Sequence, residues 1–351
     1  MFASTVTGLT TLLDKMIAQS RMRVAQDRQD ELAKELMRNA AQGQSPQWLL
    51  ISSIGRAAQD LDMWNVKRGE MFCATRIPGT PVLTPSDALV LYGGPVEYFH
   101  HFPDRVGAVM TFEMDESKAI VDESVRNITN GGLHDCSVVA LEVDYESATV
   151  EPIAFNLHEP REFPGRFVSY VKTPSPVDAR VLVVMCSDSR ICPPETPDGV
   201  PMVIRTLGGY LPPYADGSNE TTLLNRYLRV WLTGGPADKH IVIVAHGDFG
   251  GGGQPCGAAR AALDPCGVHG ECLRAVIQTI RNDTMRYERT AIVDPESSAR
   301  SIAETTRRNI MSYPAVAESI RAGTESDELV GVLLMDTVTN ELFHADLSDF
   351  D

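Results

Sequence analysis

The stretch PVDARVLVVMCSDSR, residues 176–190, decides the fold of this chain. Its middle is a continuous apolar run, which is typical of a strand buried on both faces of a parallel sheet. The polar run from Cys186 to Arg190 follows directly, so we expect these side chains in the loop at the carboxyl end of that strand. Open α/β sheets bind their ligands at this edge, which makes the loop the first candidate for a functional site.

A similar series of segments occurs earlier in the chain. Residues 44–56, QSPQWLLISSIGR, also pass from a turn through an apolar run to an arginine. Three further pairs of segments follow in the same order: 69–79 with 199–209, 91–112 with 223–246, and 137–153 with 329–345. Four landmarks in one order indicate a duplicated unit. A single continuous α/β domain is the alternative.

The repeat predicts an α/β fold of two tandem units, each with a mostly parallel sheet flanked by helices. A chain of 351 residues is long enough for two such domains. We expect the first unit at residues 1–165 and the second at residues 166–351. The segment HEPREFPGRF, residues 158–167, is rich in proline and charge and is the expected linker.

The composition excludes several classes of function. A formal net charge of −16 argues against a nucleic-acid surface, which needs an excess of Lys and Arg. No apolar run approaches the about 20 residues of a membrane span, and the N-terminus reads as an amphipathic helix rather than a secretory signal. The seven cysteines follow no disulfide framework, which suits a reducing compartment. We therefore expect a cytoplasmic protein that acts on a small molecule.

Two cysteines and one histidine are placed to bind a metal. Cys186 ends one apolar run, His246 follows the run IVIVA, and Cys256 opens the helical run CGAARAAL. Two thiolates and an imidazole suit Zn²⁺ and leave a fourth position for water, as in catalytic zinc sites. A closed structural site is the alternative. Its fourth ligand would be Cys266, His269 or Cys272.

In these features the chain resembles the β-class carbonic anhydrases. The motif Cys-x-Asp-x-Arg in CSDSR, the histidine after a strand, the helix start CGAARAAL and the closing hairpin occur in the order of that family. The resemblance implies a tandem form, with a degenerate first half and a zinc-binding second half paired as an intrachain pseudo-dimer. It also implies Zn²⁺-dependent hydration of CO2 to bicarbonate, homo-oligomers of such chains, and a place in the cytoplasm or within a carbon-concentrating compartment.

The spacing of the expected ligands departs from that family. The family usually has His-x-x-Cys-Gly, whereas here the third residue after His246 is Phe249, and Cys256 lies ten residues on. Either GDFGGGGQP, residues 247–255, is an insertion that returns Cys256 to the metal, or Phe249 has replaced the ligand. We favour the insertion, because CGAARAAL is the expected helix start.

The first half lacks the metal ligands but keeps other motif positions. The residues aligned with Cys186, Asp188 and His246 are Ser53, Gly55 and Phe112. Gln44, Phe72 and Tyr98 stand where plant-type members of the family close the zinc pocket from the partner subunit. The resemblance thus implies a composite pocket, with an amide and an aromatic wall from the first half. The alternative is an ordinary polar residue and two core aromatics.

The resemblance also implies roles for the side chains. Zn²⁺ would lower the pKa of its bound water toward about 7. Asp188 would accept a hydrogen bond from the resulting hydroxide, and Arg190 would hold Asp188 ionised through a charge-assisted pair. Gln44 would donate to a substrate oxygen as negative charge develops there. His240 and His269 are candidate proton shuttles, because histidine titrates near neutrality.

Two other functions fit the same residues. The site could hydrolyse CS2 or COS, since a metal hydroxide attacks any linear heterocumulene. The chain could instead be a non-catalytic bicarbonate sensor or an assembly subunit, which the alignment with Phe249 as the lost ligand would favour.

Overall fold

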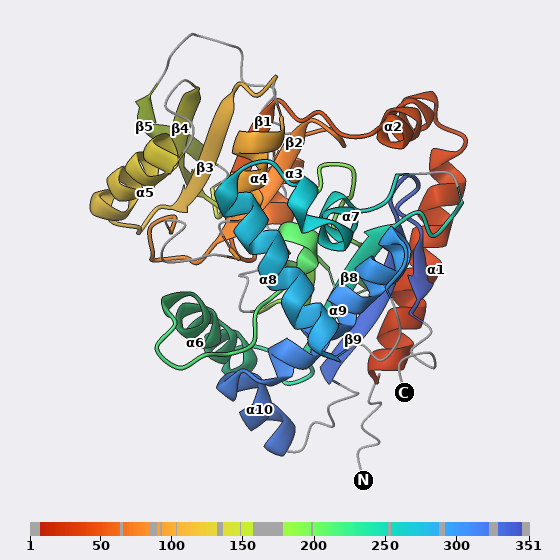
Figure 1. The fold of residues 1–351 in the computed structure, drawn as a ribbon. Coiled ribbons are helices and arrows are strands. Elements are labelled where there is room, and N and C mark those ends of the chain that lie inside the picture. The colour runs from red at the N-terminus through yellow and green to blue at the C-terminus, as the bar shows by residue number, and fades with distance from the viewer. Residues whose placement is uncertain are drawn as a thin grey trace.

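The computed structural model describes residues 8–63, 66–83, 90–91, 93–102, 104–131, 136–147, 149–156, 178–197, 199–251, 254–287, 292–322 and 329–345. The expected linker at residues 158–167 lies outside the described residues. Within them the chain forms two five-stranded sheets, one from each half, with helices packed around them (Figure 1).

The first sheet has the strand order β2-β1-β3-β4-β5. Its strands are β1 (Trp48–Ser53), β2 (Met71–Arg76), β3 (Gly107–Glu113), β4 (Ser137–Asp144) and β5 (Thr149–Asn156). All neighbours pair in parallel except β5, which runs antiparallel to β4. The helices of this region are α3 (Ala57–Met63), α4 (Gly93–His101) and α5 (Lys118–Gly131).

The second sheet has the order β10-β9-β8-β6-β7. Its strands are β6 (Val181–Cys186), β7 (Met202–Thr206), β8 (His240–Gly247), β9 (Val330–Asp336) and β10 (Leu342–His344). Only β10 is antiparallel to its neighbour. The helices are α6 (Asn219–Thr233), α7 (Gly257–Leu263), α8 (Glu271–Tyr287), α9 (Pro295–Met311) and α10 (Pro314–Arg321).

The duplication predicted from the sequence is confirmed by the topology. Replacing β1 to β5 by β6 to β10 in order reproduces the strand order and the strand directions of the second sheet. The register agrees as well, because Leu49 pairs with Phe72 as Leu182 pairs with Met202. The fold is therefore two tandem α/β units with mostly parallel sheets.

The strand register corrects one position of the sequence alignment. β1 and β6 pair with β3 and β8 so that Gly107 is equivalent to His240. Counting six residues along both strands places Glu113, and not Phe112, at the position of His246. The loop before β3 is one residue shorter than the loop before β8, so the two segments do not align without a gap. A shift of one residue turns a strand side chain to the opposite face.

The N-terminal helices cross from one half to the other. They are α1 (Leu9–Asp27) and α2 (Glu31–Gln42). The apolar face of α1 packs on β9 and β10, where a Cβ on Gly331 would lie 3.0 Å from a Leu9 methyl carbon. Figure 1 shows α1 beside β9 at the edge of the second sheet. Helix α1 therefore stabilises the second half by burying apolar surface against it. None of the described helices combines the length and the apolar character needed to traverse a bilayer.

The two halves meet along the edge strands β2 and β7. Thr75 Oγ1 donates to the Arg205 carbonyl, 3.3 Å away, and accepts from the Arg205 amide at 3.2 Å. The Cys73 amide donates to the Ser187 carbonyl at 3.1 Å, and the Gly69 amide donates to the Ser189 carbonyl at 2.8 Å. Backbone of the first half thus fixes the loop that follows β6, which carries the candidate site.

Candidate metal centre

Cys186, His246 and Cys256 come together at the carboxyl edge of the second sheet. Cys186 ends β6, His246 lies near the end of β8, and Cys256 is the N-cap residue of α7. One donor atom from each residue lies within 4.8 Å of the other two. The three residues are 4%, 1% and 2% exposed, respectively. In the part of the chain that the structure describes, no other group of three His, Cys, Asp or Glu donors is as close.

The loop between β8 and α7 brings Cys256, rather than Phe249, beside the other two donors. The Phe249 ring lies against Gly247 and under the Arg300 guanidinium, whose central carbon is 5.1 Å from the ring centroid. Phe249 is thus engaged with α9 and with its own strand end. The position of Cys256 is the one expected if residues 247–255 are an insertion.

Thr337 holds the His246 ring in place. Its Oγ1 lies 3.0 Å from His246 Nδ1 and 3.1 Å from the Gly247 carbonyl oxygen, to which it can donate. The tautomer with the proton on Nδ1 suits both contacts and leaves Nε2 available to a metal. Nε2 is buried and has no hydrogen-bond partner among the described residues. A second group that orients the ring in this way is typical of metal-binding histidines.

Asp188 is held by Arg190 beside these donors. Arg190 Nε donates to Asp188 Oδ1 at 3.0 Å, and Nη2 donates to Oδ2 at 2.6 Å. Burial alone would raise the pKa of Asp188, but the hydrogen bonds and charge of Arg190 hold that pKa below its usual value. Asp188 Oδ2 lies 3.8 Å from His246 Nε2. Arg190 Nη2 also donates to the Pro255 carbonyl at 3.2 Å, which ties the pair to the loop before Cys256.

The donor set fits Zn²⁺. The hydrogen-bonded thiol of Cys256 and burial raise the pKa of Cys186 well above its usual value. The Cys186 thiol therefore resists ionisation unless a cation balances the charge, and metal binding supplies that balance. Tetrahedral Zn²⁺ with the usual bond lengths needs donors about 3.5–3.8 Å apart. That spacing is compatible with donor atoms that lie within 4.8 Å of one another.

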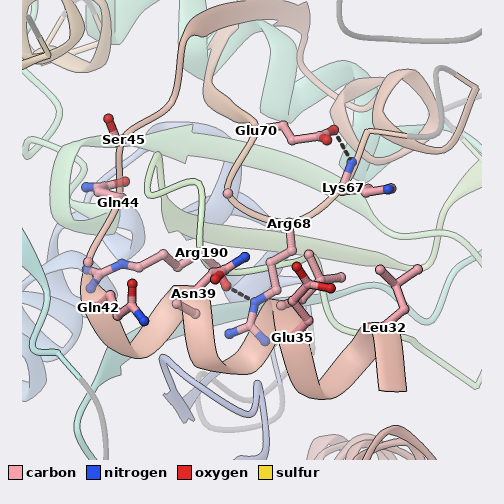
Figure 2. Close-up of a pocket in the computed structure, with 14 residues that line it drawn as sticks. Leu32, Glu35, Asn39, Gln42, Gln44, Ser45, Lys67, Arg68, Glu70 and Arg190 are labelled. Carbon is pink, nitrogen blue, oxygen red and sulfur yellow. Dashed lines mark hydrogen bonds between the residues drawn. The ribbon is translucent and has the colours of Figure 1, made fainter. Parts of the chain in front are cut away.

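Gln44 of the first half reaches the candidate site. Its Oε1 accepts from the Ser189 amide at 3.2 Å and from Ser189 Oγ at 3.1 Å. The amide therefore has its carbonyl engaged and its NH₂ group left to donate. Gln44 and Arg190 border two cavities, one of about 610 Å³ and one of about 730 Å³. Figure 2 shows both residues on the wall of the smaller cavity, at the end of α2.

Phe72 and Tyr98 lie in an aromatic cluster of the first half. Both side chains are buried, with ring centroids 6.5 Å apart, and Phe102 packs against each of them. The Tyr98 hydroxyl donates to the backbone carbonyls of Gln47 and Gly107. These contacts are those of core aromatics, and a direct part in the pocket stays a prediction.

The structure adds Glu97, which the sequence analysis missed. Glu97 Oε1 lies 3.8 Å from the position that a Cβ on Gly257 would take, and Gly257 directly follows Cys256 in the chain. Glu97 also lines the larger cavity, together with Gln44 and Arg190. Glu97 is only 8% exposed. Burial, followed by the charges of Cys186 and Asp188, raises its pKa well above the usual value. The signal in the sequence was a lone acid within an apolar segment, since unpaired acids are rarely buried.

No protein-family model and no curated protein matches the sequence. Among solved structures, the chain is similar to the β-carbonic anhydrase CcaA, at 22% identity and a TM-score of 0.37, over 50% of this chain and 76% of that one. It is similar to the β-carbonic anhydrase CafA of Aspergillus fumigatus, with 20% identity and a TM-score of 0.35, over 50% of this chain and 84% of that one. A carbon disulfide hydrolase matches with 15% identity and a TM-score of 0.25, over 49% of this chain and 80% of that one. The likeness to β-carbonic anhydrases that the sequence indicated is thus also found among solved structures, over about half of this chain.

Proposed function

We propose that this chain is a zinc-dependent carbonic anhydrase that converts CO2 and water reversibly to bicarbonate and a proton. The observation that carries the proposal is the buried triad of Cys186, His246 and Cys256, in which His246 Nε2 has no hydrogen-bond partner among the described residues. When bound there, Zn²⁺ would supply the Lewis acidity that activates water near neutral pH.

Asp188 and Arg190 orient the attacking water in this proposal. Asp188 is ionised because Arg190 pairs with both of its oxygens. An ionised carboxylate only accepts hydrogen bonds, so it holds the water with a lone pair free to attack carbon. The hydrogen bond from Arg190 to the Pro255 carbonyl holds the Asp188 carboxylate at a fixed position relative to Cys256.

Gln44 positions the substrate. Because Ser189 engages the amide oxygen, the NH₂ group can donate to the oxygen of CO2 on which negative charge develops. Phe72 and Tyr98 contribute indirectly, because their packing holds β2 and α4 in place beside the larger cavity. The proposed pocket is thus composite, with metal donors from the second half and an amide from the first.

The two halves have different roles in this proposal. We propose residues 1–165 as a unit without metal and residues 166–351 as the catalytic unit. Arg56 Nε lies 3.4 Å from Glu113 Oε1, so an ion pair stands at the strand end where the second half has His246. Oligomers of such chains and a cytoplasmic place belong to the proposal.

In this proposal, the charged groups of the larger cavity favour CO2 over its sulfur analogues, although apolar side chains such as Leu207 and Leu273 also line it. Charged and polar side chains line the larger cavity, including Glu97, Arg190, Arg260 and His101. Such a lining suits release of a bicarbonate anion and offers little to apolar CS2. Hydrolysis of CS2 or COS is therefore the second candidate.

Two measurements on the purified full-length chain test the function. Elemental analysis should find about one zinc per chain, as expected for one three-donor site. Stopped-flow assays with CO2, COS and CS2 should show the fastest turnover with CO2. Fast CS2 hydrolysis with negligible CO2 hydration would assign the second candidate. A chain that takes up no zinc and turns over none of the three gases would favour a non-catalytic role.

A further inference from the structure

Arg68 extends from the first half to two segments of the second half that surround the metal centre. Its Nε donates to the carbonyl of Arg190, in the loop after β6, and its Nη2 donates to the carbonyl of Thr337, in the turn after β9. Figure 2 shows the first of these hydrogen bonds as a dashed line. One side chain of the first half thus joins two segments that are far apart in the sequence of the second.

The two carbonyls belong to the residues that hold Asp188 and His246. The Arg190 guanidinium pairs with both oxygens of Asp188, and the Arg190 amide donates to Asp188 Oδ1 at 2.8 Å. Thr337 Oγ1 lies 3.0 Å from His246 Nδ1. Arg190 and Thr337 are therefore the supports of the candidate site, and Arg68 bonds to the backbone of both.

The turn that carries Arg68 is itself held in place. The Lys67 amide donates to Glu70 Oε2 at 2.7 Å, and the Gly69 amide donates to the Ser189 carbonyl at 2.8 Å. Gly69 has φ +91°, a conformation that favours glycine. The backbone around Arg68 is therefore fixed against the loop after β6, at a distance that the arginine side chain spans.

Asn340 of the second half contacts the same two carbonyls. Its Nδ2 lies 3.3 Å from each of them, and its Oδ1 accepts from the Cys192 amide at 2.7 Å. A carbonyl oxygen has two lone pairs, so Asn340 and Arg68 can both donate to it. The guanidinium is the stronger donor because it is charged. The second half thus links the two segments by itself, and Arg68 adds a charged link from the first half.

The charges around Arg68 favour a bound guanidinium. Burial lowers the pKa of Arg68, while the charges of Cys192, Asp188 and Asp336 act in the opposite direction. Both aspartates are buried. Without Arg68, these carboxylates would have less positive charge nearby, and each of the two carbonyls would lose its charged donor.

We propose that Arg68 is a positioning residue, which holds the Arg190–Asp188 pair and the Thr337–His246 contact in the arrangement that binds Zn²⁺. The inference rests on the proposed function, and specifically on its zinc site. Docking of the two halves then raises the metal affinity of the second half, although no residue of the first half is a ligand.

The test measures zinc affinity by chelator competition on the full-length chain. Arg68→Ala should bind zinc roughly tenfold more weakly, at the lower end of the range for outer-shell partners of a metal. Guanidinium ion at millimolar concentration should restore part of this affinity, because it can occupy the space of the lost side chain, and Na⁺ at the same ionic strength should not. Arg23→Ala is the matched control, since Arg23 also reaches the second half but pairs there with the exposed Glu195 at 2.9 Å.

A second readout reports the geometry at the metal. The visible absorption of the Co²⁺-loaded chain should change in Arg68→Ala, because the His246 ring and the Asp188 carboxylate are held less firmly, and should stay the same in Arg23→Ala. A role confined to docking the halves would lower the midpoint of thermal unfolding but leave the zinc affinity and the Co²⁺ spectrum of the folded chain unchanged. That result would overturn the proposal.

Arg68→Lys decides the question if the alanine variant does not fold. A lysine ammonium lacks the planar fork that joins two carbonyls, so zinc affinity should fall by about threefold, less than for alanine. Affinity equal to that of the unmodified chain would count against Arg68, and CO2 hydration by the unmodified chain would then leave the proposed function intact. If the unmodified chain binds zinc but hydrates no CO2, the proposed function fails, while the zinc affinities still decide the role of Arg68.

Discussion

The carboxyl edges of the two sheets differ far more than the sheets do. In the second sheet this edge carries Cys186 and His246, whereas Ser53 and Glu113 occupy the equivalent positions in the first. Strand order and register are the same in both halves. Buried apolar strands thus preserve the fold, while a few side chains at the strand ends decide the chemistry.

Asp60 of the first half and Asp188 of the second half are both buried, but their carboxyl groups are stabilised differently. Asp188 pairs with Arg190, which lowers its pKa despite burial. Asp60 accepts from the hydroxyls of Ser52, Thr111 and Tyr145. There the effect of burial exceeds that of the hydrogen bonds, so the pKa of Asp60 is raised. A guanidinium stabilises a buried negative charge better than neutral donors do. The second half therefore keeps an ionised carboxylate at its candidate site.

The first half contributes side chains to the candidate site of the second half. Gln44 bonds to Ser189 in the loop after β6, and Glu97 lies beside Gly257. The first half, with Ser53 and Glu113 in place of Cys186 and His246, therefore still forms part of the surroundings of the candidate site. Four variants test this difference between the halves.

The largest effect is expected at the third metal donor. Cys256→Ser should remove zinc and all CO2 hydration, because a ligand loss exceeds the about 10–100-fold cost of losing an outer-shell partner. Phe249→Ala, on the same loop, should keep its zinc. Elemental analysis and stopped-flow assays measure both. The reverse pattern, with zinc lost only from Phe249→Ala, would show that the loop is misplaced.

The next effect tests the contribution of the first half. Gln44→Ala should lower the rate of CO2 hydration by roughly a hundredfold with zinc retained, as for the loss of one donor to a developing oxyanion. Gln42→Ala, which borders the same two cavities, is the matched control and should change little. Equal rates in both variants would mean that the second half works without this amide.

A smaller effect is expected at Thr337, which lies against the His246 ring. Thr337→Val keeps the side-chain shape but removes the acceptor of His246 Nδ1, so zinc affinity should fall about 10–100-fold. Competition with a chelator measures the affinity. Thr339→Val is the control, because Thr339 Oγ1 donates to Asp336 in the same turn. Matching affinities for the two variants would argue that Thr337 does not orient the ring.

The smallest effect concerns pH and stability in the first half. A raised folded pKa means that the folded chain binds more protons, so the contribution of Asp60 is present below the unfolded pKa of about 3.9 and is lost as pH rises through the folded pKa. The unmodified chain should therefore gain stability relative to Asp60→Asn as pH falls from neutrality, by on the order of 1 kcal/mol. Thermal unfolding across that range measures the difference. A difference that grows with rising pH would contradict the assignment.

Local pattern was enough to predict much of the molecule. The two series of apolar strands, their order and the polar run after β6 were all predicted, because strand burial leaves a continuous apolar signature in the chain. The three donors could be named from their residue types and their places at strand and helix ends. Phe112 was misplaced because the residue at which a strand pairs with its neighbour leaves no such signature.

The residues alone indicate a duplicated fold, and they place the candidate donors Cys186, His246 and Cys256 in its second copy. They left open whether Cys256 or Phe249 lies beside His246, and they carry no sign that α1 packs on the opposite half or that Glu97 lies beside Gly257; those contacts appear only in the folded chain. The reason is physical: such contacts depend on how two finished sheets dock through β2 and β7, and no local periodicity encodes that docking.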